Sequence, residues 1–270
     1  MNNYIISKSH LNRLKDGRGQ GRGREYVPFI QTNDNKVASE GWLTRTLGWK
    51  TGRIHHTLSK HEYQFLLVQE WSDNIVDIRE QYPLTPIEMT MEIASKLNIR
   101  HPHLKGENVV MSTDFMLSVV NKDEDIIDVA RTIKPVSRLT KRTLELFEIE
   151  RRYFQEIGIN WAMVFDKPKP INMIRNIDWM YDAKFLGSRP GIDLEMVDLV
   201  AGPLFNLLSS YSPKDSISKN CLKSDAELGL EAGTSLYIMQ HMLVNKVWKT
   251  DMNQLIRENR PLILESNSPY

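Results

Sequence analysis

Residues 109–135 read VVMSTDFMLSVVNKDEDIIDVARTIKP, and the architecture of the first half of the chain can be worked out from them. Apolar and β-branched residues fill 109–120 and again 126–134, which predicts two strands. The segment between them, 121–125, consists of polar and acidic residues and predicts a turn. Pro135 cannot continue the second strand. We therefore expect an antiparallel hairpin.

The register of this hairpin brings three polar residues together. Side chains alternate across a strand, so residues two apart share a face. With the turn centred on residues 122–124, Asp114 lies opposite Thr132 and on the same face as Lys134. The other face is the more apolar one, so Asp114 points away from it. The spacing alone leaves two interpretations open, an ordinary cross-strand ion pair or part of a reactive site.

Regular elements surround the hairpin. A capping box, Ser59-Lys60-His61-Glu62, predicts the start of a helix that reaches about Trp71. Apart from an inserted helix, the predicted order is α-β-β-β-α-β, an α/β fold. In chain order, the other predicted elements are a strand at 75–82, the inserted helix beginning at Thr85-Pro86-Ile87-Glu88, an amphipathic helix at 140–157 and a short buried strand at 160–166.

The capping box adds a second carboxylate, Glu62, to the polar residues of the hairpin. Mg²⁺ is a hard ion that takes carboxylate and water oxygens, polarises a phosphoryl oxygen and lowers the pKa of a bound water. A lysine nearby can orient that water or stabilise the developing charge. Glu62 and Asp114 with Lys134 therefore fit metal-dependent phosphodiester cleavage. The alternative for Glu62 is its role in the capping box, which by itself explains a glutamate at that position.

Basic residues near the N-terminus form a second candidate site. Residues 8–24 contain six Lys or Arg and one acid, and four glycines alternate there with Arg18, Arg22 and Arg24. Glycine lets a backbone approach a ligand closely, and arginine pairs with phosphate through two parallel hydrogen bonds. We expect a mobile arm or loop that contacts phosphate, with a solvated tail as the alternative.

The segment Lys167-Pro168-Lys169-Pro170 is the expected domain boundary, because its two prolines favour an extended linker. The expected domains cover 1–167 and 171–270. Residues 1–170 contain 25 Lys or Arg against 22 Asp or Glu, whereas the remainder contains 10 against 12. The first part is therefore the better candidate for binding a polyanion, and the acidic second part suits a basic protein partner.

The second domain has a mostly helical pattern, around 173–181, 195–208 and 236–244. Two short apolar runs, at 247–248 and 262–264, predict a small hairpin. Helices followed by a hairpin are typical of a winged-helix-like module.

The composition argues against several classes of protein. A chain of 270 residues with 41% hydrophobic and 26% charged residues is globular, and no apolar run approaches the roughly 20 residues of a membrane helix. No signal-peptide pattern is evident, and the single cysteine, Cys221, fits a reducing cytoplasm. Without a glycine-rich phosphate loop, use of ATP is not expected. His55 and His56 lack further ligands at zinc spacing, so we expect them to contact solvent or phosphate.

Several motifs resemble the TnsA family, the endonuclease subunits of heteromeric cut-and-paste transposons. The resemblance runs in order over residues 11–181 and is diffuse after about residue 185. The motifs are GRGQG at 17–21, KTGRIHH at 50–56, VDIREQYPL at 76–84, MSTDF at 111–115, IKP at 133–135 and LFEIERRY at 146–153.

The resemblance implies a restriction-endonuclease-like domain of the PD-(D/E)xK class, followed by a helical domain. It implies hydrolysis at the 5′ ends of a transposon with Mg²⁺, for which Mn²⁺ can substitute. It also implies two partners besides double-stranded DNA, a DDE transposase (TnsB) and an AAA+ ATPase (TnsC) that docks on the C-terminal domain. The expected location is the bacterial cytoplasm, at the nucleoid when in complex.

The resemblance also assigns site residues. Glu62 and Asp114 match the family's metal-binding carboxylates, and Lys134 matches its catalytic lysine. Thr132 stands where a Gln or Glu is expected, which leaves its backbone carbonyl as the metal ligand. Glu150 is similar to a glutamate that supports the site. The expected DNA contacts are Arg18, Arg22, Arg24, Lys50, Arg53, His55 and His56.

Two other functions remain open at this point. One is a restriction-like or repair nuclease that cuts without partners. The other is a DNA-binding scaffold that has kept the fold without the activity, for which Thr132 is the motivating residue.

Overall fold

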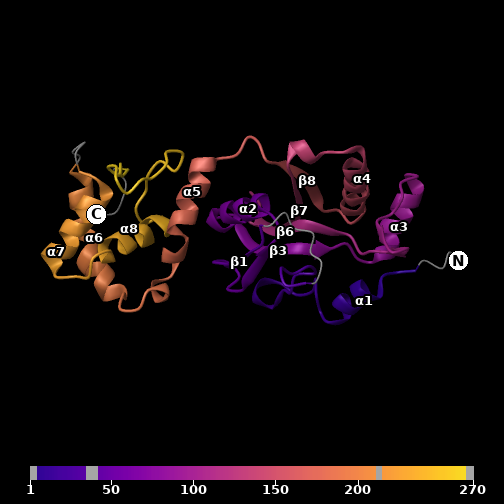
Figure 1. Cartoon of the computed structure of the whole chain (residues 1–270), viewed down its shortest axis with the longest axis horizontal. Coiled ribbons are helices and arrows are strands. Elements are labelled where there is room, and N and C mark those ends of the chain that lie inside the picture. Colours follow the sequence, from indigo (N-terminus) through magenta and orange to yellow (C-terminus); the bar gives the residue numbers. More distant parts are fainter. Residues whose placement is uncertain (1–4, 35–41, 211–214, 266–270) are drawn as a thin grey trace. The chain divides into compact units, whose positions relative to one another are not determined.

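A computed structural model describes residues 5–34, 42–210 and 215–265. The chain forms two compact units, Met1–Lys169 and Pro170–Tyr270, which are treated separately below (Figure 1). In the described ranges, no helix combines the length and apolar character needed to cross a bilayer.

The first unit is built on a four-stranded sheet in the order β3-β6-β7-β8. The strands are β3 (Ile75–Pro83), β6 (Ser112–Val120), β7 (Ile126–Lys134) and β8 (Asn160–Phe165). β6 pairs antiparallel with both β3 and β7, and β8 pairs parallel with β7. The predicted hairpin and its register are confirmed, because Phe115 pairs with Arg131 and the pairing continues in step to Val120 and Ile126.

The hairpin opens at the end opposite its turn. The pairing of β6 with β7 stops at Phe115 and Arg131, whereas β7 remains paired with β8 as far as Lys134. β6 likewise remains paired with β3 as far as Ser112. The two central strands thus diverge while their outer edges stay in the sheet, which leaves room for side chains between them.

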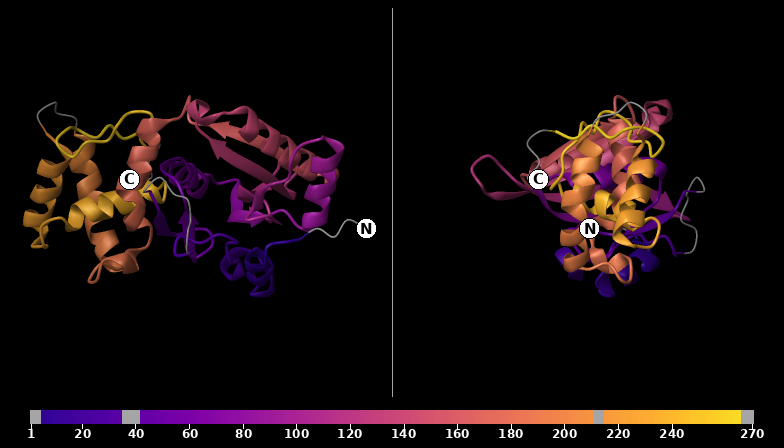
Figure 2. Two further views of the ribbon diagram at one scale, coloured as in Figure 1. Left: turned by 45° about the vertical axis from the view of Figure 1, so that its right-hand side comes forward. Right: turned by 90° about the vertical axis from the view of Figure 1, so that its left-hand side faces the viewer.

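Helices cover the two faces of the sheet (Figures 1 and 2). α2 (Lys60–Trp71) covers one face, where its Leu66 belongs to an apolar cluster with Ile78 and Phe115. α3 (Ile87–Lys96) and α4 (Lys141–Glu156) cover the other face with an apolar cluster of their own. The residues of that cluster are Leu84, Ile93, Ala94, Met111, Met116, Ala130, Ile149, Tyr153 and Phe154.

Local sequence explains where these helices begin. The hydroxyl of Ser59 accepts from the amide of Glu62, so the predicted capping box of α2 is confirmed. Thr140 caps α4 in the same way. For α3 the expected cap is not formed, because the helix begins at Ile87 with Pro86 before it and no side chain on its first amides.

The N-terminal segment was expected to be a mobile arm, and the structure corrects this. It contains α1 (Lys8–Lys15) and a short 3-10 turn, η1 (Gly23–Glu25). The segment packs against β3 closely enough that a Cβ on Gly19 would lie 2.2 Å from Cγ of Pro83. The physical reason is a pair of buried anchors in the same segment, Tyr26 and Phe29, which the glycine-rich composition concealed.

Two small hairpins were not predicted. β1 (Thr44–Leu47) pairs with β2 (Ile54–Thr57), and β4 (His103–Leu104) pairs with β5 (Glu107–Asn108). Each lies outside the four-stranded sheet. A further 3-10 turn, η2 (Val136–Arg138), connects β7 to α4.

The second unit is helical in its described residues. Its helices are α5 (Ile171–Met180), α6 (Leu194–Ser209), α7 (Ile217–Leu228) and α8 (Thr234–Val244), with 3-10 turns η3 (Tyr181–Lys184) and η4 (Leu186–Ser188). The sequence had predicted all but α7 of the four helices.

The hairpin predicted near the end of the chain does not form strands within residues 245–265. Its two segments nevertheless lie side by side. The amide of Glu265 donates to the carbonyl of Lys249, and the hydroxyl of Thr250 donates to the carbonyl of Ile263. Two such contacts do not make a ladder.

Candidate active site

A pocket of about 290 Å³ lies where β6 and β7 diverge. It gathers residues from α2, β3, β6, β7, η2 and α4. The residues predicted to be catalytic, Glu62, Asp114 and Lys134, all line it, although they are up to 72 positions apart in the chain, and the predicted supporting residue Glu150 lines it as well. The lining residues are Leu58, Ser59, His61, Glu62, Gln81, Ser112, Asp114, Thr132, Ile133, Lys134, Pro135, Arg138, Phe147 and Glu150.

Glu62 enters the pocket from the first turn of α2. Its carboxylate accepts from the hydroxyl of Ser59 at 2.9 Å, from the amide of Leu58 at 2.9 Å and from Nε2 of Gln81 at 3.2 Å. Only 8% of the residue is exposed. The two interpretations of Glu62 are therefore compatible, because one carboxylate completes the helix cap and lines the pocket.

Asp114 enters from the end of β6 that has lost its pairing to β7. Its Oδ2 accepts from the amide of Ile133 at 2.6 Å. This amide of β7 lies beyond the point where β6 and β7 stop pairing. The hydroxyl of Thr113 donates to the carbonyl of Arg131 in the same gap. The divergence of the strands thus supplies a backbone donor that holds one carboxylate oxygen in position.

The carboxylates of the pocket do not ionise independently. Burial and the nearby Asp114 raise the pKa of Glu62 to about 8. Burial raises the pKa of Asp114 to about 7, with Glu150 raising it further and the Ile133 amide and Lys134 opposing. Like charges that share a desolvated site favour protonation, and such shifts are concentrated at functional sites. An ordinary cross-strand ion pair between Asp114 and Lys134 does not account for two further carboxylates in the same pocket.

Thr132 takes part in the site through its side chain as well as its backbone. Its hydroxyl donates to Glu150, and Nε1 of Trp161 donates to the same carboxylate at 2.9 Å. The hydroxyl also lies 3.1 Å from that of Thr113. Burial raises the pKa of Glu150. A short hydroxyl at position 132 therefore leaves room for the glutamate of α4 to reach the pocket.

The donor set fits a hard divalent cation. Glu62 and Asp114 present carboxylate oxygens to one pocket, and a bound cation would offset the burial that disfavours their ionised forms. Mg²⁺ is commonly held by one or two carboxylates and keeps several waters. Among the residues that the structure describes, no group of three or more His, Cys, Asp or Glu side chains is placed to hold a metal ion by itself.

The expected DNA-contact arginines of the N-terminal segment lie in different environments. Arg18 pairs with Asp34 at 2.8 Å, and Arg22 pairs with Asp128 at 2.6 Å while its side chain stays 60% exposed. Arg24 is exposed in η1. The segment was expected to offer its positive charge to phosphate, but acids of the same unit balance two of its three arginines.

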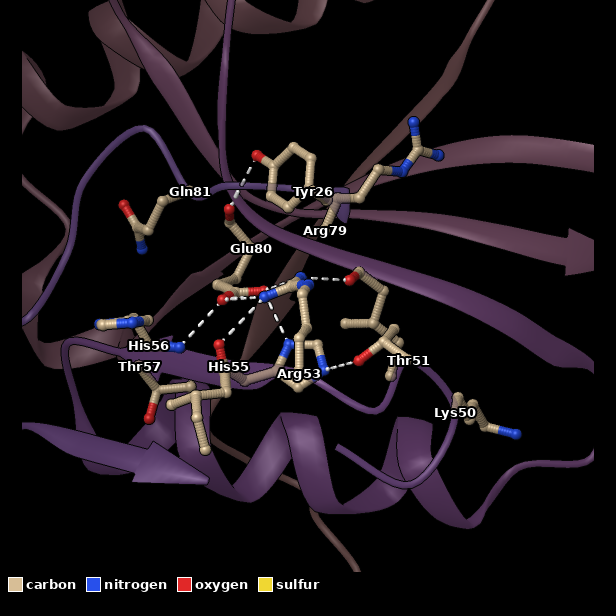
Figure 3. Close-up of polar contacts among 12 residues, drawn as sticks. Tyr26, Lys50, Thr51, Arg53, His55, His56, Thr57, Arg79, Glu80 and Gln81 are labelled. Atoms are coloured by element: carbon tan, nitrogen blue, oxygen red, sulfur yellow. Dashed lines mark hydrogen bonds and ion pairs between the residues drawn. The ribbon is translucent and has the colours of Figure 1, made fainter. Parts of the chain in front are cut away.

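The KTGRIHH motif forms the turn and second strand of the β1–β2 hairpin, and three of its residues, Thr51, Arg53 and His55, are buried (Figure 3). Both Nη atoms of Arg53 donate to Glu80, at 2.8 and 2.6 Å, and Nδ1 of His55 lies 2.7 Å from the same carboxylate. His55 is completely buried, and Arg53 is 8% exposed. Buried side chains cannot reach a phosphate, so the structure does not support Arg53 and His55 as DNA contacts.

Of the four expected DNA contacts in this motif, Lys50 and His56 remain accessible. Lys50 is half-buried, and its amide donates to Glu70 at 3.0 Å. His56 is half-buried, with Nδ1 at 2.9 Å from the hydroxyl of Thr32. Both lie on the β1–β2 hairpin rather than on the pocket.

Sequence reasoning missed several residues of the pocket. Gln81 was not predicted to belong to the site, although its left-handed backbone (φ 50°) sets it apart and its side-chain amide donates to Glu62. His61 is next to Glu62, and its position in the capping box was the available signal. Arg138 and Phe147 carry no periodic signal that would have placed them in the pocket.

Comparisons with known proteins identify the family of this chain. A family model described as "TnsA-like endonuclease N terminal" matches residues 72–166, and one described as "TnsA endonuclease C terminal" matches residues 170–252. The Escherichia coli "Transposon Tn7 transposition protein TnsA" is 35% identical over 249 residues, which cover 92% of this chain and 87% of that protein.

Proposed function

This chain belongs to the TnsA family of transposition endonucleases, and we propose that the pocket around Glu62, Asp114 and Lys134 is where it hydrolyses DNA. One observation carries the assignment. Two carboxylates with strongly raised pKa values and a lysine meet in one pocket, at the point where two paired strands diverge.

The proposed fold of the first unit is that of restriction endonucleases. Its support is the order α2-β3-β6-β7-α4-β8, with the two carboxylates and the lysine brought together by α2, β6 and β7. For the second unit, a winged-helix-like description rests on its helices and on the adjacent segments 249–250 and 263–265. These two segments would form the wing of such a module, and they make hydrogen bonds to each other without forming regular strands.

In the proposed site, Glu62, Asp114 and the backbone carbonyl of Thr132 would hold Mg²⁺, or Mn²⁺ in its place. The ion supplies Lewis-acid polarisation of the phosphate and a water of lowered pKa. Lys134 orients the attacking water and stabilises negative charge that develops on the phosphate. Gln81 and Ser59 hold the Glu62 carboxylate in one orientation through their hydrogen bonds.

We also propose that the cleavage is made at the 5′ ends of a transposon and requires partner proteins. The partners would be a DDE transposase of the TnsB type and an AAA+ ATPase of the TnsC type, working in the bacterial cytoplasm. The excess of acids over bases beyond residue 170, 12 against 10, supports docking of the second unit on a basic protein surface rather than on DNA.

The test is replacement of Asp114 by Ala, assayed for cleavage of transposon ends with Mg²⁺ and the partner transposase present. We expect a loss of at least about a hundredfold, since a metal-binding and charge-stabilising group is removed. Asp123→Ala is the matched control, because this exposed aspartate in the turn of the same hairpin changes charge equally.

Each outcome decides the assignment. Cleavage by Asp114→Ala at the wild-type rate would place the chemistry elsewhere. Efficient cleavage by the isolated chain would favour a nuclease that works alone. DNA binding that never leads to cleavage, with metal or chelator, would favour a scaffold.

A further inference from the structure

The first turn of α4 has an unexpected charge distribution. The helix begins with Lys141 and Arg142, and no acid lies in its first turn. The N-terminal end of a helix carries partial positive charge, so acids are normally favoured there and cations are not. An anion bound beside this turn would relieve the repulsion.

The loop that follows the C-terminal end of α3 adds another cation, Arg100. Nη2 of Arg142 donates to the backbone carbonyl of Arg100 at 2.6 Å, which holds the loop after α3 against the start of α4. α3 and α4 lie next to each other in this unit (Figure 1). Arg100 in turn donates to His103, and both side chains are exposed.

These cations are continuous with the catalytic pocket. Arg138, in the turn directly before α4, is exposed and lines the pocket. We call Arg138, Lys141, Arg142 and Arg100 the α4 cation row. Arg142 shares its charge with Glu145 at 3.2 Å. Within the described ranges, neither Arg100 nor Lys141 has an acidic partner, and both are exposed.

The basic N-terminal segment, residues 8–24, is a weaker candidate for binding phosphate than the α4 cation row. There, Arg18 and Arg22 already pair with acids, and phosphate would have to displace those carboxylates. Counterions are released, and affinity gained, only for positive charge that is available to the phosphates. Of the two basic groups, the α4 cation row therefore offers the more available charge, at Arg100 and Lys141.

We propose that the α4 cation row binds the phosphate backbone of the DNA duplex where it leaves the catalytic pocket. The proposal rests on the proposed function of that pocket. Contacts of this kind fix the position of a duplex without reading its sequence. They would hold the DNA so that one phosphodiester enters the pocket beside Lys134.

The test measures binding of the full chain to a duplex of about 30 base pairs by fluorescence anisotropy, in EDTA so that nothing is cut, at salt concentrations of about 20 to 200 mM. The variants are Arg100→Gln and Lys141→Gln, alone and together. Lys122→Gln is the matched control, because this exposed lysine lies in the turn at the opposite end of β6 and β7. Thermal denaturation checks that each variant is folded.

We expect each row variant to reduce the slope of log K against log salt by about 1, and the double variant by about 2. Lys122→Gln should keep the wild-type slope. Slopes of the row variants equal to the wild-type slope would overturn the proposal. A reduced slope for Arg24→Gln instead would place the DNA on the N-terminal segment, and absence of duplex binding by the wild type would overturn it as well.

The result of the DNA-binding experiment can be distinguished from the result of the Asp114→Ala cleavage assay. If Asp114→Ala still cuts, the catalytic assignment fails while the salt slopes still decide where the duplex lies. If Asp114→Ala is inactive and the slopes do not change, the pocket stands and only the α4 cation row is wrong.

Discussion

At the scale of single residues, the site consists of carboxylates held in place by neutral donors. Glu62 is fixed by a hydroxyl, an amide and the Gln81 side chain, and Asp114 by the Ile133 amide. Neutral donors orient a carboxylate without neutralising it. These hydrogen bonds lower the pKa values of the two carboxyl groups, but burial and the neighbouring carboxylates outweigh them and raise both values.

A first prediction concerns the stability of the metal-free protein against pH. Glu62 and Asp114 have folded pKa values of about 8 and 7, above the ordinary 4.5 and 3.8, so the folded state binds protons more tightly than the unfolded chain. Their contribution to stability is complete below about pH 4 and is lost as the pH rises through about 7 to 8. We expect the Tm in EDTA to fall from about pH 5 to 8, and Asp114→Asn to weaken this fall.

Thermal denaturation followed by circular dichroism provides the measurement. Asp123→Asn, on the exposed turn, should keep the wild-type dependence on pH. Identical pH profiles for Asp114→Asn and wild type would show that these carboxylates are not coupled in the folded protein.

A second prediction concerns Thr132. Thr132→Val keeps the shape but removes the hydroxyl that donates to Glu150, which leaves the Trp161 donor on that buried carboxylate. We expect a loss of about 1–3 kcal/mol in the free energy of unfolding. We also expect slower cleavage, whereas Thr132→Ser should retain both properties. Urea denaturation and the end-cleavage assay measure the two effects, and full activity of Thr132→Val would show that only the backbone of residue 132 matters.

At the scale of elements, the β1–β2 hairpin is attached through buried charges. Glu80 of β3 accepts from Arg53 and from the amide of His56, and His55 lies between Glu80 and Glu70. Burial alone would raise the pKa of Glu80, but His55 and Arg53 hold it well below its ordinary range. Gly48 makes this packing possible, because a Cβ there would lie 2.4 Å from Nε2 of His55.

The third prediction follows from that attachment. Glu80→Gln leaves Arg53 buried without its carboxylate, and removal of one partner of a buried pair typically costs about 3–5 kcal/mol. We expect a loss of that size in urea denaturation. Glu92→Gln, an exposed glutamate of α3, is the control and should change stability little. A small effect of Glu80→Gln would mean that the hairpin is held by its other contacts.

At the scale of the whole molecule, the last residue of the first unit contacts α2, the helix that carries Glu62. Nζ of Lys169, the last residue of the first unit, donates to Oε1 of Gln64 at 2.7 Å and lies 3.3 Å from Nδ1 of His61. Both partners are on α2, and His61 lines the pocket. The end of the first unit therefore packs on the helix that carries Glu62.

The fourth prediction concerns truncation. A fragment of residues 1–169 should unfold in one cooperative transition, since it contains the complete sheet and both of its helical layers. A fragment that ends at residue 166 should fold as well, with about 1 kcal/mol less stability because the Lys169 hydrogen bond is lost. Urea denaturation compares the two, and a fragment 1–169 without a cooperative transition would show that the units depend on each other.

The reach of sequence reasoning differed between parts of the chain. α2, the β6–β7 hairpin and α4 were predicted because caps, turns and alternation are local signals. The N-terminal segment was mispredicted because two buried aromatics, Tyr26 and Phe29, outweigh its glycines. α7 was missed although Ser216 caps it and Gly229 ends it, since its buried face includes the polar residues Asn220, Ser224 and Asp225.

The sequence by itself predicted the order of the sheet strands with α2 and α4, the hairpin register, and Glu62, Asp114 and Lys134 as candidate site residues. Local hydrogen bonding and side-chain alternation are sufficient for these, because they act between residues close in the chain. Only the tertiary structure decided which charges are available. Arg53 and His55 are buried in contact with Glu80, which is 25 or more positions away in the chain. Arg100 and Lys141, in contrast, remain exposed. Burial and ion pairing depend on neighbours in space, which no local pattern reveals.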